Sequence, residues 1–348
     1  MKDIRYKIDF AMLCSAYHLG QPVTEPEQIF GGFLHRMYRL KTDQAEYAVK
    51  ALNPQIMQRS TAMDNYILSE KVANVARRNG INALPAILTK GSFLHEVNGQ
   101  YYLLFPWVEG KPLPAGMIDL ECCKVIGRTL AQIHGTDFSG LLADDPGEKR
   151  QDLAADWKGY ARQAAEQELD WASLLLANLD NLQTWENRAN AASELLMNNR
   201  IISHRDLDPK NVLWDDQRMP VLIDWEAAGP INGVQELLEV AMYWSVSDTG
   251  VPVKEAFQSL IEAYLLQGGT VLNHWGDALD AGFQGKLEWL VYSIRRSLSL
   301  DYTDEQGQAL GTQEVLHTLD ALLAYAGSIP VVLEWLADID AKFGINIR

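Results

Sequence analysis

The chain has 348 residues, which is enough for two lobes that each bury a hydrophobic core. Its net charge of −16 argues against a nucleic-acid-binding protein, because phosphate contacts need clustered Lys and Arg. Three cysteines exclude a disulfide framework, and neither a signal peptide nor an uninterrupted apolar run of roughly 18 to 20 residues is apparent, so we expect a cytoplasmic protein without a membrane span.

The first third of the sequence alternates short apolar runs with turns. Gly31 and Gly32 precede a predicted β-hairpin formed by 36–40 and 46–52. A helix should follow over 60–78, where the apolar positions have helical spacing and Asn-Gly ends the pattern. Three more antiparallel strands, separated by Lys-Gly and Asn-Gly turns, are predicted at 86–89, 92–97 and 101–105.

Long helices dominate the rest of the chain, at about 118–135, 150–168, 170–199, 233–246, 252–267, 284–300 and 311–347. A β-rich part followed by a helical part predicts an α+β protein with domains 1–105 and 110–348. Residues 1–106 carry 12 Lys/Arg and 9 Asp/Glu, whereas the remainder has a balance of −19. The positive part suits a polyphosphate and the acidic part a cationic ligand, although acidic surfaces also simply confer solubility.

The polar run 204–211, His-Arg-Asp-Leu-Asp-Pro-Lys-Asn, is the strongest chemical signal. It holds the carboxylate of Asp206 and, five residues later, the amide of Asn211. Two apolar runs around a polar turn predict a hairpin that brings Asn211 near Asp224. Phosphoryl transfer in the kinase fold needs one Asp to orient a hydroxyl, and an Asn and an Asp to hold Mg²⁺. The motif therefore predicts a Mg²⁺-dependent kinase.

With these residues, the chain resembles the aminoglycoside phosphotransferase/choline kinase family of small-molecule kinases, from about residue 28 to 300. The resemblance implies a two-lobed protein-kinase-like fold, a hinge at about 105–109, and ATP or GTP as the co-substrate. It places Asp206 at the catalytic base, and Asn211 and Asp224 at the metal-binding positions. Arg205 stands where most small-molecule kinases have Gly.

Five residues are expected around the nucleotide. The resemblance places Lys50 on the strand lysine that holds the phosphates, and a buried ammonium in any case needs a counter-charge or an anionic ligand. Glu70 is expected to pair with Lys50. Gly31 and Gly32 either approach the phosphates or form an ordinary turn, and Trp107 either flanks the base or packs between the lobes. His35 has no assigned role.

The acceptor substrate is predicted from charge alone. The acidic balance favours an amine-bearing alcohol, such as an aminoglycoside or a related antibiotic, or a small amino alcohol. Antibiotic resistance and a metabolic role both stay open. Candidate substrate-binding acids are Asp208, which alternatively fixes Lys210, together with Glu226 and Glu236. A metabolic kinase for an amino alcohol or a sugar, of the choline-, fructosamine- or methylthioribose-kinase type, is the first alternative, and a nucleotide-binding pseudoenzyme the second. The oligomeric state stays open.

A protein kinase would also have His-Arg-Asp in its catalytic loop. Here only eight residues separate Asp224 from the helix predicted at 233–246, which leaves no room for an activation loop on which a protein segment could dock. The sequence therefore favours a small-molecule kinase.

Overall fold

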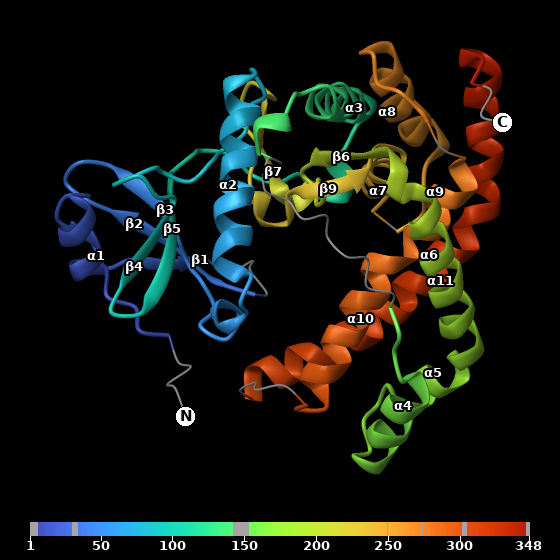
Figure 1. Ribbon diagram of the computed structural model, residues 1–348, viewed down its shortest axis with the longest axis horizontal. Helices are drawn as coiled ribbons and strands as arrows, with labels where there is room; N and C mark the ends of the chain where they lie inside the picture. Colours follow the sequence, from blue (N-terminus) through green and yellow to red (C-terminus); the bar gives the residue numbers. More distant parts are fainter. Residues whose placement is uncertain are drawn as a thin grey trace. The chain divides into compact units, whose positions relative to one another are not determined.

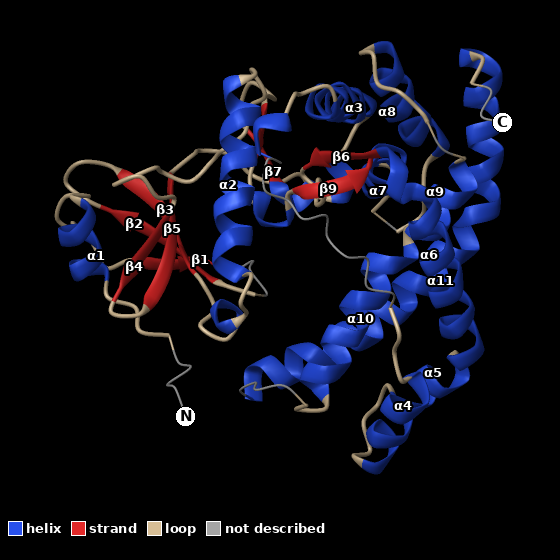
Figure 2. Cartoon of the chain, in the orientation of Figure 1, coloured by secondary structure: helices blue, strands red, loops and turns tan. Residues whose placement is uncertain are grey.

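The computed structural model describes residues 6–29, 34–141, 153–248, 250–272, 274–300 and 305–345 (Figure 1). The chain divides into two compact units, each assembled from separate stretches of sequence. Unit 1 consists of Met1–Met117, Thr136–Asp144 and Ile202–Gly229, and unit 2 of Ile118–Gly135, Asp145–Ile201 and Pro230–Arg348. The longer strands belong to unit 1, whereas helices make up nearly all of unit 2 (Figure 2), which confirms the predicted α+β class.

Unit 1 contains a five-stranded antiparallel sheet in the order β1-β2-β3-β5-β4. Its strands are β1 (Glu27–Ile29), β2 (Arg36–Lys41), β3 (Glu46–Ala51), β4 (Leu94–Val97) and β5 (Gln100–Pro106). The predicted strand at 86–89 is wrong, because its backbone is bound elsewhere: the amide of Ala86 donates to the carboxylate of Glu70, and Ile87 donates to the carbonyl of Leu104. β1 was not predicted.

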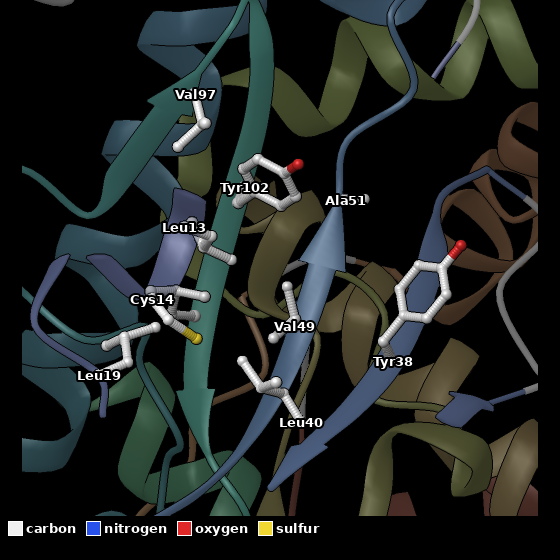
Figure 3. Packing of buried hydrophobic residues seen from close by; sticks show 10 residues of the cluster. Leu13, Cys14, Leu19, Tyr38, Leu40, Val49, Ala51, Val97 and Tyr102 are labelled. Atoms are coloured by element: carbon white, nitrogen blue, oxygen red, sulfur yellow. The ribbon is translucent and has the colours of Figure 1, made fainter. Parts of the chain in front are cut away.

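The alternation of side chains along β3 assigns each residue to one face of the sheet. Val49 and Tyr102 join a buried cluster with Leu13 and Cys14 of helix α1 (Phe10–Tyr17), as Figure 3 shows. A second cluster contains Tyr66 of helix α2 (Ala62–Arg78) and lies on the other side. Lys50, one residue after Val49, therefore points to the α2 side. α2 was predicted, whereas the eight-residue α1 was not.

The segment Ile202–Gly229 belongs to the unit that contains the sheet, which differs from the expected contiguous domains 1–105 and 110–348. Its predicted hairpin is present as β7 (Val212–Trp214) and β8 (Pro220–Leu222). Backbone hydrogen bonds explain the placement: Leu222 donates to Asn82 at 2.9 Å, Leu84 donates to Leu222 at 2.9 Å, and Trp214 exchanges two bonds with Lys111. The polar run 204–211 thus belongs to the unit that carries Lys50.

Unit 2 is built from α3 to α11, and the predicted helices are largely confirmed. The range 170–199 is broken at Asn178, and α9 was not predicted. The boundary between the units falls in β6 (Arg200–Ser203) and β9 (Gly229–Asn232). The helices are α3 (Leu120–His134), α4 (Trp157–Glu166), α5 (Ala172–Ala177), α6 (Leu179–Leu196), α7 (Gly233–Trp244), α8 (Lys254–Leu266), α9 (Trp275–Ala281), α10 (Phe283–Ser297) and α11 (Glu305–Phe343).

The long helix α11 corrects the expectation that no segment is apolar enough for a membrane. By length and composition alone, Gly307–Phe343 could cross one. Within unit 2, however, α11 packs along α10, and its residues Val315, Leu322 and Leu336 are fully buried. A helix that buries one face in this way is typical of a protein core.

The close packing of α3 on α8 gives a stability prediction. A Cβ at Gly127 would overlap the carbonyl oxygen of Leu260, whereas a Cβ at Gly285 in α10 would meet nothing within 4 Å. We expect Gly127→Ala to lower the free energy of unfolding by about 1–3 kcal/mol. Gly285→Ala, the matched control, should raise it by about 0.5–1 kcal/mol, because alanine has the higher helix propensity. Denaturant titration measures both, and equal stabilities would contradict the packing argument.

Candidate active site

The loop that carries Asp206 is closed by its own side chains. The amide nitrogen of Asn211 donates to the backbone carbonyl of Asp206 at 2.9 Å and to its Oδ2 at 2.8 Å. The amide of Lys210 donates to Asp208 Oδ1 at 2.9 Å, which caps the short turn Pro209–Asn211. The Asp206 side chain stays 38% exposed. Its carboxylate is therefore held in place and still accessible.

His204 supports this loop from beneath. It is fully buried, its Nδ1 accepts the amide of Asp206 at 3.3 Å, and its Nε2 lies 3.1 Å from the carbonyl oxygen of Ile223. Because Nδ1 accepts, Nε2 carries the proton and donates. The next residue, Arg205, has a φ of 65°, a left-handed conformation that suits the Gly of the resembled family better than a branched side chain. Two neighbouring residues thus fix the direction of Asp206.

Lys50 meets two carboxylates of the segment that follows β8. Its Nζ lies 2.7 Å from Asp224 Oδ1 and 2.5 Å from Glu226 Oε2, and its side chain is only 8% exposed. Burial lowers the pKa of Lys50, but the charges of Asp224 and Glu226 outweigh it and hold that pKa well above the usual value. For Glu226, burial raises the pKa, and Lys50 and His35 together bring it well below its usual range. Lys50 and Glu226 are therefore both charged at neutral pH.

Glu70 does not form the expected ion pair with Lys50 in this structure. It is 2% exposed, and its Oε2 accepts the amide of Ala86 at 2.5 Å. Burial raises its pKa to about 7, a rise that this hydrogen bond and the charge of Lys50 only partly offset. The counter-charge that was expected from α2 comes instead from Asp224 and Glu226.

His35 is the site residue that the sequence did not reveal. Its Nε2 lies 3.3 Å from Glu226 Oε2 and 2.8 Å from the hydroxyl oxygen of Tyr66, and its Nδ1 accepts the amide of Asn53 at 3.0 Å. A single histidine near a glycine pair matches no motif. Glu226, predicted as a substrate contact, thus lies between His35 and the expected phosphate lysine.

Of the other residues predicted to contact the nucleotide, only Trp107 lies within the described part of the chain. Gly31 and Gly32 lie outside the described residues. Trp107 stacks under the guanidinium of Arg39 at 4.1 Å, and its Nε1 donates to Glu109 at 2.9 Å. A role for Trp107 beside the base stays a prediction.

The two other candidate substrate acids differ in accessibility. Asp208 keeps a 26% exposed side chain, and its Oδ2 lies 3.7 Å from Lys210 Nζ. Both alternatives for Asp208, a substrate contact and the fixing of Lys210, stay predictions. Glu236, in α7, is 1% exposed and bound to His134 at 2.9 Å, which itself contacts the hydroxyl of Tyr264. The prediction for Glu236 is therefore corrected: the side chain is an internal partner of His134 within unit 2.

A metal ion fits the donor set that the sequence predicted. Over the described ranges, no group of three or more His, Cys, Asp or Glu side chains could hold a metal. Mg²⁺ is commonly bound by one or two carboxylates together with substrate phosphates and waters. The amide nitrogen of Asn211 is bound to Asp206, which leaves its carbonyl oxygen as a ligand, and Asp224 has an oxygen beyond its bond to Lys50. These two residues would hold Mg²⁺.

Known proteins share both the sequence pattern and the fold. The model of the phosphotransferase enzyme family matches residues 25–272. Spectinomycin phosphotransferase APH(9)-Ia, solved in complex with ADP and spectinomycin, is similar with a TM-score of 0.69 and 14% identity, over 92% of this chain and 99% of that one. A search of the curated proteins found no match.

Two metabolic kinases are also similar. The ethanolamine kinase of Plasmodium vivax gives a TM-score of 0.56 with 15% identity, covering 86% of this chain and 83% of that one. The choline kinase of Streptococcus pneumoniae gives 0.53 with 16% identity, covering 89% and 98%. At such identities the structures show a shared kinase-like fold.

Proposed function

The chain belongs to the phosphotransferase enzyme family, whose members are small-molecule kinases acting on hydroxyl groups, and from this premise we propose that it transfers the γ-phosphate of ATP or GTP to an amine-bearing alcohol. One observation carries the chemistry: unit 1 alone holds Asp206 bound to Asn211, and Lys50 bound to Asp224. These are the base, metal and phosphate positions of phosphoryl transfer.

The proposed mechanism is a direct in-line transfer. Asp206 orients the acceptor hydroxyl and takes its proton late in the reaction. Lys50 donates to the phosphates from a buried position, where its charge is effective. Asn211 and Asp224 would hold Mg²⁺, which neutralises phosphate charge when bound. Lys210, with its Nζ 4.0 Å from Asp206 Oδ1, adds positive charge beside the base.

The proposal predicts an acid limb in the pH profile. Burial raises the pKa of Asp206 to about 6, Lys210 opposes this rise, and Asp208 and Asp224 add to it. A base must be ionised, so kcat/KM should fall about tenfold for each pH unit below 6 and level off above it. Lys210→Met should move the limb to higher pH, because it removes a cation that lowers this pKa. Initial rates between about pH 5 and 8 test this, and a flat profile would contradict a base of this kind.

The proposal that the acceptor is cationic rests on the negative charge of the protein. The part of the chain after residue 106 has a balance of −19, and Asp208 offers a partly exposed carboxylate two residues from the base. Similar structures include kinases named for ethanolamine and choline, both amino alcohols, and for spectinomycin. An aminoglycoside-type antibiotic and a small amino alcohol are therefore the two acceptor classes that we propose.

A coupled assay of ADP and GDP release across acceptors tests the function. Aminoglycosides, spectinomycin, choline and ethanolamine form one panel, and macrolides, neutral sugars and sugar acids the other. We expect turnover in the first panel, above the background that the Asp206→Asn protein gives with the same compounds. Turnover confined to the second panel would reject the cationic acceptor. Stabilisation by nucleotide without turnover of any acceptor would favour the pseudoenzyme.

A further inference from the structure

Four segments of unit 1, far apart in the sequence, meet at the carboxylate of Glu226. Lys50 comes from β3, His35 immediately precedes β2, Tyr66 lies in α2, and Glu226 itself follows β8. Oε2 of Glu226 lies 2.5 Å from Lys50 Nζ and 3.3 Å from His35 Nε2. Tyr66 reaches the same His35 nitrogen at 2.8 Å. The contacts form one chain from the Tyr66 hydroxyl to the ammonium.

Backbone geometry fixes the direction of the hydrogen bond that His35 makes. The amide of Asn53 can only donate, so the Nδ1 of His35, 3.0 Å away, must be the acceptor. The proton of the neutral ring is then on Nε2, the nitrogen that faces Glu226 and Tyr66. His35 is 5% exposed and Tyr66 8%, so little water competes for this donor. The one Nε2 proton therefore faces two acceptors, the Tyr66 hydroxyl oxygen at 2.8 Å and Glu226 Oε2 at 3.3 Å, and His35 is a shared second donor to Glu226 beside Lys50.

The position of Glu226 determines where the ammonium of Lys50 points. An ammonium has three N–H bonds, and Lys50 donates two of them to Asp224 and Glu226. The positions of these two carboxylates therefore set the direction of the third N–H bond. Glu226 lies in the three-residue 3₁₀ turn Trp225–Ala227, which has no side-chain cap, so side-chain contacts help to set its orientation. An acceptor in the helix, Glu70, is instead bound to the amide of Ala86.

We propose that His35 is a positioning residue of the nucleotide site, which holds Glu226 so that Glu226 can orient Lys50 toward the phosphates. This relay performs the task that the sequence predicted for Glu70. The inference rests on the proposed function only in assigning the phosphates to Lys50. It concerns nucleotide binding and makes no statement about the acceptor.

Two substitutions of His35 separate this role from a purely structural one. His35→Asn keeps a polar atom at the position of Nδ1, next to the amide of Asn53, but loses the donor to Glu226. His35→Gln places an amide nitrogen at the position of Nε2 and keeps that donor. Isothermal titration with MgADP should show about tenfold weaker binding for His35→Asn, and binding within about threefold of wild type for His35→Gln. Tyr66→Phe removes the competing acceptor of the Nε2 proton and should leave MgADP binding within about threefold of wild type.

Non-additivity gives the second test. In a Glu226→Gln background, His35→Asn should weaken MgADP binding by less than about twofold, because both changes break one relay. Glu70→Gln is the control and should leave MgADP affinity within about twofold of wild type, since its acceptor for Ala86 remains. With acceptor substrate present, the relay variants should raise the KM for nucleotide more than they lower kcat.

Different results would overturn the relay and the proposed function. Equal losses in His35→Asn and His35→Gln, or additive losses in the double variant, would overturn the relay and leave His35 a packing residue. A larger loss in Glu70→Gln than in Glu226→Gln would return the role to Glu70. Failure of the wild-type protein to bind MgADP would reject the proposed function itself. This outcome is distinct from a failure of the relay, which appears only as differences between variants.

Discussion

Replacing Asp206 with asparagine should lower kcat by about 10²–10⁴-fold, because the acceptor hydroxyl loses its base and the amide cannot take a proton. MgADP affinity should stay within about threefold of wild type, since Asp206 is bound to Asn211 and is not itself a phosphate or metal contact. Asparagine retains the size of the side chain and an acceptor for the Asn211 amide, so the loop should keep its shape. Steady-state kinetics together with titration calorimetry measure the two effects.

Asp216→Asn is the control for this substitution. Asp216 is exposed in the turn of the β7–β8 hairpin, in the same segment of the chain, and the same change of charge there should leave kcat within about twofold. An Asp206→Asn enzyme with wild-type turnover would remove the centre of the proposed mechanism. A matching loss in Asp216→Asn would show that net charge, and not the base, controls the rate.

The second large effect is expected at Asp224. Asp224→Asn should weaken nucleotide binding by at least about a hundredfold in the presence of Mg²⁺, which corresponds to roughly 2.7 kcal/mol. Binding without Mg²⁺ should stay within about threefold of wild type, because the amide oxygen of asparagine can still accept a hydrogen bond from Lys50. Titration of ADP with Mg²⁺ and with EDTA distinguishes these effects.

The choice of asparagine at Asp224 follows from the backbone. Asp224 has a φ of 57°, a left-handed conformation that asparagine adopts more readily than alanine. Alanine would add roughly 1 kcal/mol of backbone strain to the loss of the ligand and confuse the two. An Asp224→Asn protein whose nucleotide affinity still rises with Mg²⁺ as in wild type would show that the metal is held elsewhere.

Local patterns allowed much of unit 1 to be predicted. The apolar run of β3 ends in Lys50, and a polar turn between two apolar runs gave the β7–β8 hairpin with Asn211 and Asp224 at its ends. Each of these features depends on neighbours within a few residues, which a single sequence displays directly. The family resemblance then added functional roles to those positions.

Long-range partners could not be read in the same way. Glu70 and Glu226 are both acids that suit an ammonium, and only the fold decides that Glu226 meets Lys50 while Glu70 meets the amide of Ala86. For Glu236 a signal did exist. Val240, one helical turn after Glu236, is apolar and buried, which puts Glu236 on the inner face of α7, where a buried carboxylate needs a partner such as His134.

The discontinuous make-up of unit 1 has a consequence for its synthesis on the ribosome. The strands of the sheet have all been translated when Met117 is added, but the stretch that completes the unit ends only at Gly229. At roughly 5–20 residues per second, this interval lasts about 6 to 20 seconds. During this interval, the hydrogen-bond partners of Asn82, Leu84 and Lys111 in β7 and β8 have not all been synthesised. The same holds for the two carboxylates that pair with Lys50. The nascent chain therefore contains Lys50 long before it contains Asp224 and Glu226, the two carboxylates that pair with it.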